Sequence, residues 1–291
     1  MKAKKKRLGT KAKIRAEKER KRKIAITILL ALMLLLLVFS AYFGYTFLNQ
    51  SQNQSQTVGS ESSELKAAIV DQLSLTFPNK TFIEKATEIL EQAGYKVDYY
   101  PGEKVTVEFY RNLPTHGYKI IILRVHSTAT NSDGTEGPVT LFTSERYDRS
   151  KYVYEQLTDQ LVATAFSREE REKGIIYFGI NPPFVTQSMK GSFQNTIIIV
   201  MGCEGLDNPL MAEAFIQKGA KVYISWNQPV SASHTDLATI HLLQHFLIEK
   251  RTVKEAIQET YKDVGADPVY KSLLIAYPIE ALDYTIQNIN G

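Results

Sequence analysis

The sequence predicts an α/β protein, namely a three-layer α/β/α sandwich with a mostly parallel sheet, preceded by a single transmembrane helix. Short runs of β-branched residues alternate with helical stretches of roughly 10 to 15 residues, a pattern typical of parallel βαβ units. One run, residues 197–201, is uninterrupted Ile, Val and Met, as expected for a strand buried on both faces. An apolar segment near the N-terminus is long enough to cross a bilayer.

The first 48 residues predict a membrane anchor. Residues 1–23 are dense in Lys and Arg and predict a basic cytoplasmic tail. Residues 24–48, which begin with Ile24 and end with Leu48, are almost wholly apolar. At about 1.5 Å rise per residue they are long enough for a hydrocarbon core of about 30 Å. We therefore expect a single-pass protein of the cell membrane, with its N-terminus cytoplasmic and its C-terminal domain extracytoplasmic.

Two other interpretations of this region carry less weight. A cleaved signal peptide would have a shorter apolar core and a small-x-small cleavage site, which the sequence does not show. The basic tail could also contact anionic lipid head groups or RNA, but a topology signal explains it more simply. Residues 49–64 are rich in Gln, Ser and Asn and predict a flexible stalk, so residues 65–291 form the folded domain.

Composition excludes several classes of function. The net charge of +4 is concentrated in the first 23 residues, which leaves the rest acidic and argues against a nucleic-acid partner. One cysteine excludes a disulfide framework. The sequence contains no Walker A motif, no Gly-x-Ser-x-Gly elbow and no Gly-x-Gly-x-x-Gly fingerprint. We therefore expect no nucleotide, no serine nucleophile and no cofactor.

The first half of the domain predicts an alternation of strands and helices. Residues 82–93 carry Phe82, Ala86 and Ile89 at helical spacing and are followed by Gly94. A second helix is expected at 105–113 and a third at 152–166. Strands are expected at 67–73, 96–100, 118–125 and 174–179, with a hairpin strand at 139–143.

The second half repeats the alternation around the run at 197–201. A helix at 209–218 leads into a strand at 221–225, and further helices are expected at 233–250 and 253–264 before a last strand at 272–277.

Two predicted strands end in residue types suited to catalysis. His126 and Ser127 follow one strand, and Cys203, the only cysteine, follows another between Gly202 and Glu204. The carboxyl ends of parallel strands share one edge of a sheet, so the imidazole and the thiol are expected to lie together. Taken alone, the cysteine could be a buried small hydrophobe and the histidine a strand-end residue of no special role.

A thiol beside an imidazole predicts nucleophilic catalysis. Cys203 would attack an acyl carbon, while His126 would accept the thiol proton and protonate the leaving amine. Backbone N–H groups of Cys203 and Ser127 are expected to form an oxyanion hole. The predicted substrate is therefore an acyl compound with an amine leaving group.

The sequence from Ile198 through Cys203 to Trp226 resembles the caspase-like (clan CD) cysteine peptidases, which include caspases, gingipains, legumain, separase and bacterial CHAT domains. The CHAT-type domains match best. In that family the catalytic Cys strand is followed by a helix, a small-residue turn and a strand that ends in Ser-Trp. The resemblance, over roughly residues 67–277, implies a caspase-like sheet and a cysteine endopeptidase that cleaves a protein or peptide substrate with a His126/Cys203 dyad. Together with the apolar segment 24–48, it predicts a membrane-anchored, outward-facing enzyme.

The chain departs from the family pattern at two points. Ser127 stands where the family usually has Gly, which affects the backbone of the expected oxyanion hole. The spacing from His126 to Cys203 exceeds the roughly 50 residues of caspases. An insertion over residues 146–183 would account for the difference.

Trp226, Glu204 and Asp133 are expected to bind substrate. Trp226 ends the strand after the Cys strand and would form one wall of the slot, although it could equally be a core aromatic residue. Asp133 and Glu136 on one side, with Glu204 and Asp207 on the other, would favour a Lys or Arg side chain in the slot.

Three alternatives remain. His241 and His245 have the spacing of a helical zinc pair, but Leu242 stands where a zinc peptidase needs its Glu base, so no metal is expected. A catalytically silent caspase-like module could bind a peptide or protein partner at the cell surface. An acyltransferase or amidase on the same fold is indistinguishable from a peptidase at the level of sequence.

Overall fold

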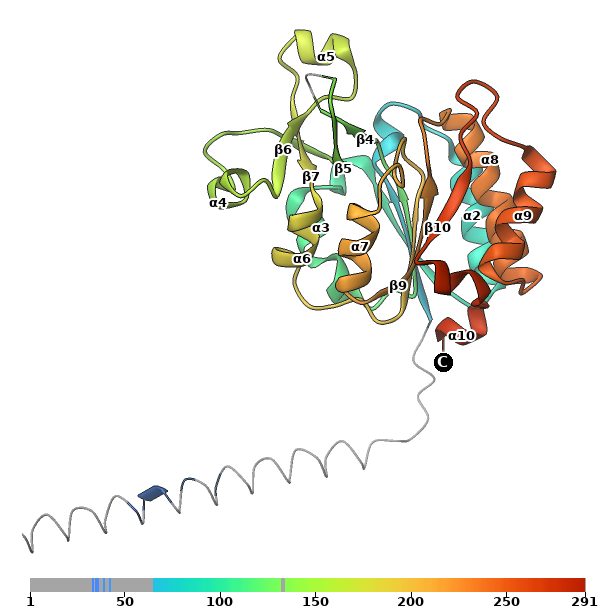
Figure 1. Cartoon of the computed structure of the whole chain (residues 1–291), viewed down its shortest axis with the longest axis horizontal. Helices are drawn as coiled ribbons and strands as arrows, with labels where there is room; N and C mark the ends of the chain where they lie inside the picture. The colour runs from blue at the N-terminus through green and yellow to red at the C-terminus, as the bar shows by residue number, and fades with distance from the viewer. Residues whose placement is uncertain are drawn as a thin grey trace, which may run out of the picture. The chain divides into compact units, whose positions relative to one another are not determined.

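The computed structural model describes residues 65–131 and 134–290, together with five helical residues near the N-terminus: Met33, Leu35, Leu36, Phe39 and Tyr42. By its internal contacts the chain divides into two units, Met1–Ser63 and Glu64–Gly291. The second unit carries the fold labelled in Figure 1.

The main sheet of this unit has six strands in the order β10-β9-β8-β3-β1-β2. The strands are β1 (Lys66–Asp71), β2 (Lys96–Pro101), β3 (Ile120–Arg124), β8 (Thr196–Val200), β9 (Ala220–Trp226) and β10 (Leu274–Tyr277). All neighbours pair in parallel except β10, which runs antiparallel to β9. The mostly parallel pairing places the carboxyl ends of β1, β3, β8 and β9 at one edge.

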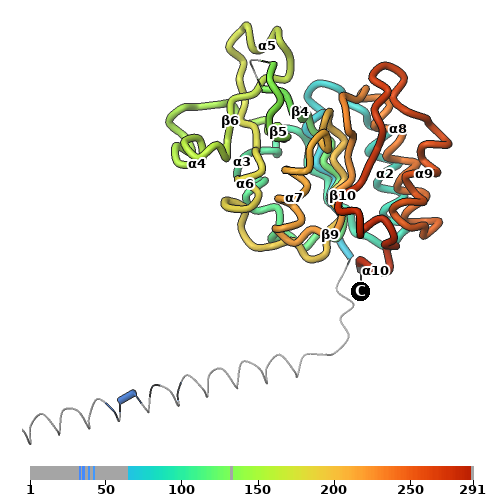
Figure 2. Tube along the Cα trace, in the orientation of Figure 1, coloured from blue at the N-terminus to red at the C-terminus, as the bar shows by residue number. Residues whose placement is uncertain are grey.

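Helices cover both faces of the main sheet (Figures 1 and 2). Successive side chains of a strand point to opposite faces, so Ile197 and Ile199 enter one core while Ile198 and Val200 enter the other. Burial of each such side chain contributes about 1.5–3 kcal/mol. The first core is covered by α2 (Lys80–Gln92), α8 (Ala232–Leu243) and α9 (Val253–Val264), and the second by α3 (Val107–Asn112), α6 (Pro182–Gln187) and α7 (Leu210–Gln217).

Polar side chains at the helix N-termini explain where two of these helices begin. The Asn79 side chain accepts a hydrogen bond from the Phe82 N–H (3.1 Å) and caps α2. Thr252 and Glu255 form a capping box at the start of α9. The other short helices of this part of the chain are of three kinds. The 3-10 helices are η1 (Gln72–Leu75), η2 (Gly102–Lys104), η3 (Leu113–His116) and η5 (Ile279–Asp283). A π-helical segment, η4 (Gln244–Ile248), continues α8, and a short α-helix, α10 (Ile286–Asn290), lies near the C-terminus.

A second sheet has four antiparallel strands in the order β4-β5-β7-β6. They are β4 (Ser127–Thr130), β5 (Glu136–Arg146), β6 (Leu161–Thr164) and β7 (Tyr177–Ile180), with short helices α4 (Val153–Leu157) and α5 (Arg168–Glu172) between them. The expected hairpin strand at 139–143 is confirmed as part of β5.

The prediction of a helix at 152–166 is correct only for its first part, which forms α4, and is wrong for the rest. The chain turns after α4, where Asp159 has a positive φ of 54°, and it then forms β6. Pairing of Val162 with Gly179 on β7 fixes this stretch as a strand. Backbone pairing with the next strand along the chain therefore overrides the helical pattern of the local sequence.

The expected fold class needs one correction. Among the residues that the structure describes, none of the helices is both long and apolar enough to span a bilayer. The longest α-helix in that part of the chain, α2, has 13 residues. At about 1.5 Å per residue it measures about 20 Å, short of a hydrocarbon core of about 30 Å. The span expected from Ile24 to Leu48 lies outside the described residues, apart from the five helical positions given above.

Candidate active site

A cavity of about 350 Å³ lies at the carboxyl edge of the main sheet, and both His126 and Cys203 line it. His126 follows β3, and Cys203 follows its neighbour β8. The structure thus places the imidazole and the thiol at one cavity. Their catalytic roles are a prediction from the sequence.

The edge of the sheet beneath this cavity is held by a buried cation. The guanidinium of Arg124 is fully buried, and its Nε and Nη2 donate to the two carboxylate oxygens of Asp236 on α8 (2.7 and 2.8 Å). Its Nη1 donates to Asp71 at the end of β1 (2.7 Å), and Nη2 also donates to the Phe77 carbonyl (2.7 Å). One side chain therefore joins β3 to β1, to α8 and to the loop before α2.

Both carboxylates of this network have further donors. Tyr99 donates to Asp71 (3.1 Å), and the Asn79 amide donates to Asp236 (2.8 Å). Burial alone would lower the pKa of Arg124, but the hydrogen bonds and charges of Asp236 and Asp71 outweigh it and raise that pKa. The guanidinium therefore stays charged, and breaking one partnership would leave a buried charge without compensation.

The imidazole of His126 sits in an aromatic cage two residues beyond Arg124. Phe166 stacks on the ring (centroids 5.3 Å apart, 19° between planes), and Phe77 and Phe142 each lie 6.0 Å from it. Its Nε2 is hydrogen-bonded to the Thr76 hydroxyl (3.0 Å). These contacts fix the ring plane.

This cage keeps the imidazole neutral. Burial, assisted by the nearby positive charge of Arg124, lowers the pKa of His126 to about 4. At neutral pH the ring can therefore accept a proton, as a general base must.

The turn that carries Cys203 requires glycine on both sides. A Cβ on Gly202 would lie 2.5 Å from the Val125 carbonyl oxygen, and one on Gly205 would collide with the Ser225 hydroxyl. Glu204 between them adopts a left-handed conformation with φ of 57°. The chain thus reverses tightly at the end of β8 and brings the cysteine to the cavity.

The thiol of Cys203 is protonated in this setting. Its Sγ contacts the backbone of Val230, donating to the carbonyl and accepting from the N–H at 3.5 Å each. Burial raises the pKa of the Cys203 thiol, and the charges of Glu204 and Asp267 raise it further, although the Val230 N–H lowers it somewhat. Among the hydrogen bonds of the described residues, none joins the thiol to the His126 ring.

Ser127 connects the two strand ends. Its hydroxyl donates to the Cys203 carbonyl (2.6 Å), a contact that glycine could not make. The Phe142 N–H donates to the His126 carbonyl (2.9 Å), which makes Ser127 and Leu141 a non-hydrogen-bonded pair of the β4–β5 ladder. The Ser127 N–H is therefore outside this ladder, as the predicted oxyanion role requires.

The acidic residues expected to line the slot lie elsewhere or are not described. Glu204 accepts hydrogen bonds from the Ala129 N–H (2.8 Å) and the Thr128 hydroxyl (3.0 Å), so its carboxylate ties the Cys203 turn to β4. Asp133 lies outside the described residues. None of the other three acids of the prediction, which are Glu136, Glu204 and Asp207, lines the cavity.

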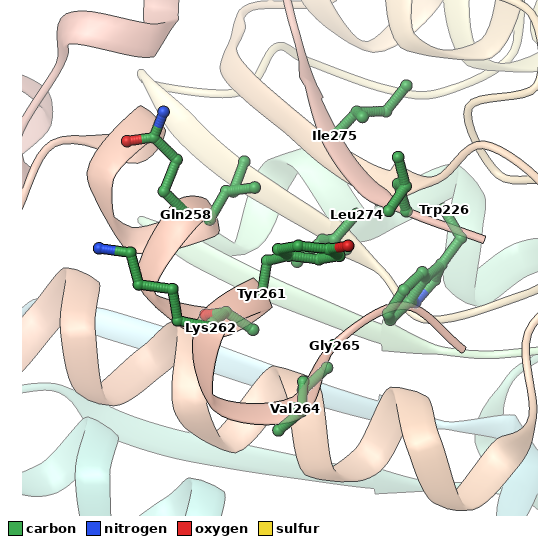
Figure 3. A pocket seen from close by; sticks show the side chains of 12 residues that line it. Trp226, Gln258, Tyr261, Lys262, Val264, Gly265, Leu274 and Ile275 are labelled. Carbon is green, nitrogen blue, oxygen red and sulfur yellow. The ribbon is translucent and has the colours of Figure 1, made fainter. Parts of the chain in front are cut away.

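Trp226 faces a different cavity. It is 2% exposed, and its indole N–H donates to the Thr235 hydroxyl (2.8 Å). A separate apolar cavity of about 570 Å³ is lined by Trp226 together with Tyr261, Val264 and Leu274, as Figure 3 shows. Cys203 packs against the same small core as the indole, so Trp226 supports the Cys203 region from behind.

Asp267 is a site residue that the sequence did not indicate. Its buried carboxylate accepts hydrogen bonds from the backbone N–H groups of Ser231 (2.8 Å), Val269 (2.9 Å) and Tyr270 (2.7 Å). Burial would raise the pKa of Asp267, but these donors lower it. Ser231, Val269 and Tyr270 all line the cavity, so Asp267 holds this part of its wall in place.

The sequence analysis did not predict the buried network of Arg124, Asp71 and Asp236, and only Arg124 could have indicated it. It interrupts an otherwise apolar strand, and a charged residue at such a position needs buried partners. Asp71 and Asp236 are far from it in sequence, so nothing in their local patterns identifies them as those partners.

Comparison with known proteins finds similarity among solved structures but not among family models or curated proteins. No family model matches the sequence, and no curated protein does. Among solved structures, the chain is similar to the crystal structure of the Arg-specific cysteine proteinase gingipain R, with 13% sequence identity and a TM-score of 0.42. The match covers 71% of this chain and 44% of that one, so the chain spans less than half the length of the proteinase.

Replacing Asp236 by Asn should destabilise the protein by about 3–5 kcal/mol, because it leaves the Arg124 guanidinium buried beside a neutral partner. Urea unfolding of the full-length chain would measure the change. The matched control is Asp283→Asn, at an exposed carboxylate, with an expected change within about 0.5 kcal/mol. A loss for Asp236→Asn as small as that of the control would contradict the role of the network.

Alkylation of Cys203 by iodoacetamide should be slow at pH 7 and should rise about tenfold per pH unit up to pH 9, because the raised pKa leaves little thiolate. The chain has one cysteine, so the rate belongs to this residue alone. Mass spectrometry of the modified protein would follow it. A fast rate that is constant from pH 5 to 7 would instead show a preformed thiolate–imidazolium pair.

Proposed function

We propose that this protein is a cysteine-type peptidase, with Cys203 as nucleophile and His126 as general base and acid. The observation that carries the proposal is the shared cavity of about 350 Å³, to which adjacent parallel strands β8 and β3 bring a thiol and a neutral imidazole. No other cysteine exists in the chain, and a thiol of this kind needs a base within reach.

The proposed reaction begins from the neutral pair. The Cys203 sulfur bonds to the scissile carbonyl carbon while its proton passes to His126, and the carbonyl oxygen takes the negative charge. The Ser127 and Cys203 N–H groups would bind that oxygen. His126 then gives the proton to the leaving amine as the C–N bond breaks. Water, deprotonated by His126, hydrolyses the resulting thioester and regenerates the thiol.

The bond between His126 and Thr76 sets the starting orientation of the ring. For proton transfer, Nε2 must exchange the Thr76 hydroxyl for the thiol, and the Cys203 sulfur must leave the Val230 backbone. These are three weak or neutral hydrogen bonds, one at His126 and two at the Cys203 sulfur, and each is worth about 1 kcal/mol. Substrate binding can supply this amount, so a resting arrangement without a thiol–imidazole bond is compatible with catalysis.

The lining of the cavity defines the substrate side chain that we propose. Leu73, Phe77, Val230, Val269 and Tyr270 contribute apolar surface, and no Asp or Glu lines the cavity. Phe77, Val269 and Tyr270 are all at least half exposed and would become covered by a bound side chain. A Lys or Arg would lose its hydration here without gaining a carboxylate partner. The slot therefore suits an apolar residue.

A silent module that binds a peptide at the same cavity is the second candidate. The raised pKa of Cys203 and the commitment of His126 Nε2 to Thr76 favour it, since neither group is activated in this arrangement. Turnover distinguishes it from the peptidase, because both would bind peptide.

Cys203→Ser and His126→Gln should each reduce peptide hydrolysis by at least about 100-fold, since nucleophile and base act as one unit. The matched control is His116→Gln, at an exposed histidine, which should keep full activity. Hydrolysis of a quenched fluorescent peptide mixture would measure the rates, with thermal unfolding as the check on folding. Wild-type rates no higher than those of Cys203→Ser, with peptide still bound, would support the silent module instead.

A peptide library should show preference for an apolar residue before the scissile bond. Replacing Tyr270 by Asp, at the half-exposed rim, should shift that preference toward Lys or Arg, because it adds the carboxylate that the cavity lacks. A wild-type preference for Lys or Arg would contradict the apolar slot while leaving the Cys203 nucleophile intact.

A further inference from the structure

We propose that His241, His245 and Asp263 form a binding site for a divalent transition metal ion of the Zn²⁺ type. These residues do not line the cavity of His126 and Cys203, and the proposed reaction does not use them. The proposal of this metal site does not rest on the proposed function.

The three side chains converge on one point. His241 Nδ1 and His245 Nε2 each lie 2.8 Å from the same oxygen, Oδ2 of Asp263. One potential ligand atom from each residue lies within 4.8 Å of the others. Zinc bonds of about 2.0–2.1 Å in a tetrahedral arrangement separate ligand atoms by about 3.3 Å. To admit the ion, the two nitrogen–oxygen separations would widen by about half an ångström, and the two nitrogens would lie about 3.3 Å from each other.

The site joins two helices that already pack together. His241 belongs to α8, His245 to the π-helical segment Gln244–Ile248 that continues it, and Asp263 to α9. Helices α8 and α9 lie side by side (Figures 1 and 2). Single π-helical turns within α-helices occur frequently at functional sites. The side chains are 36%, 12% and 38% exposed in chain order, so an ion can reach them from solvent.

A second carboxylate orients one of the proposed ligands. Glu249 Oε1 lies 3.0 Å from His245 Nδ1, on the side of the ring away from Asp263. Metal-binding histidines almost always direct their other ring nitrogen to such a partner, which fixes the tautomer and the ring plane. Arg251 in turn donates to Oε2 of Glu249 (2.8 Å) and holds that carboxylate in place.

The ligand types determine the class of ion. Two imidazoles and one carboxylate suit Zn²⁺, whereas Mg²⁺ and Ca²⁺ prefer oxygen ligands alone. Leu242 occupies the position of the general-base Glu in helical zinc peptidases, so the ion would serve as a cross-link between α8 and α9. Helix α8 also carries Asp236, the partner of Arg124, and Thr235, which lines the candidate active site. An ion here would therefore brace that site from a distance.

Zinc titration of the purified full-length chain, against a chromophoric chelator, tests the proposal. We expect one Zn²⁺ per chain, with affinity reduced at least about tenfold by Asp263→Asn and by His241→Asn, and about 10- to 100-fold by Glu249→Gln. His116→Asn is the control for loss of an exposed histidine, and Cys203→Ser is the control for binding by the thiol. Both controls should bind as the wild type does, and Mg²⁺ or Ca²⁺ should not compete.

Thermal unfolding provides the second measurement. Zn²⁺ should raise the midpoint of the wild type and of both controls, but not that of Asp263→Asn, whose midpoint without metal checks that it folds. Equal Zn²⁺ affinity of the wild type and Asp263→Asn would overturn the proposal. Binding that disappears in Cys203→Ser, or an absence of wild-type binding, would overturn it as well.

Discussion

The candidate active site depends on one buried cation. The guanidinium of Arg124 is 0% exposed, and it is compensated by two carboxylates that come from a neighbouring strand and from a helix on one face of the sheet. Charge burial costs several kcal/mol per ion unless geometry and partners are close to ideal. The network therefore allows little variation in how β1, β3, α8 and the loop before α2 meet. His126 and the Thr76 hydroxyl that holds it are attached to this junction.

The electrostatics of the cavity favour a neutral pair over a preformed ion pair. Burial lowers the pKa of His126, and burial together with nearby carboxylates raises that of Cys203, so both shifts remove charge from the resting site. An apolar cavity with neutral walls also selects against charged side chains. Activation would then depend on substrate, which covers the exposed rim and brings a carbonyl group whose oxygen develops the negative charge that the backbone N–H groups would bind.

Local sequence patterns predicted the parts of the fold that local physics decides. The apolar run at 197–201 became β8, and the glycines beside Cys203 proved necessary because neighbouring backbone and side chains leave no room for a Cβ. The prediction of a helix at 152–166 failed beyond α4 because residues 161–164 pair with β7, a contact outside the local sequence pattern. For the same reason the partners of Arg124 and the aromatic cage around His126 were not predictable. Glu204 and Trp226 were expected to bind substrate, but neither lines the cavity of His126 and Cys203, and their side chains contact the protein itself, at β4 and at Thr235.

The central claim is that Cys203 forms a covalent bond to an acyl group with the help of His126. Rapid mixing with a peptide ester that carries an aromatic residue at the scissile position, acid quenching and mass spectrometry of the intact and digested protein test it directly. The account predicts an acyl adduct on Cys203 within the first turnover, which His126→Gln forms at least about 100-fold more slowly. An adduct on another residue, or hydrolysis of the ester with no adduct and no dependence on Cys203, would contradict it.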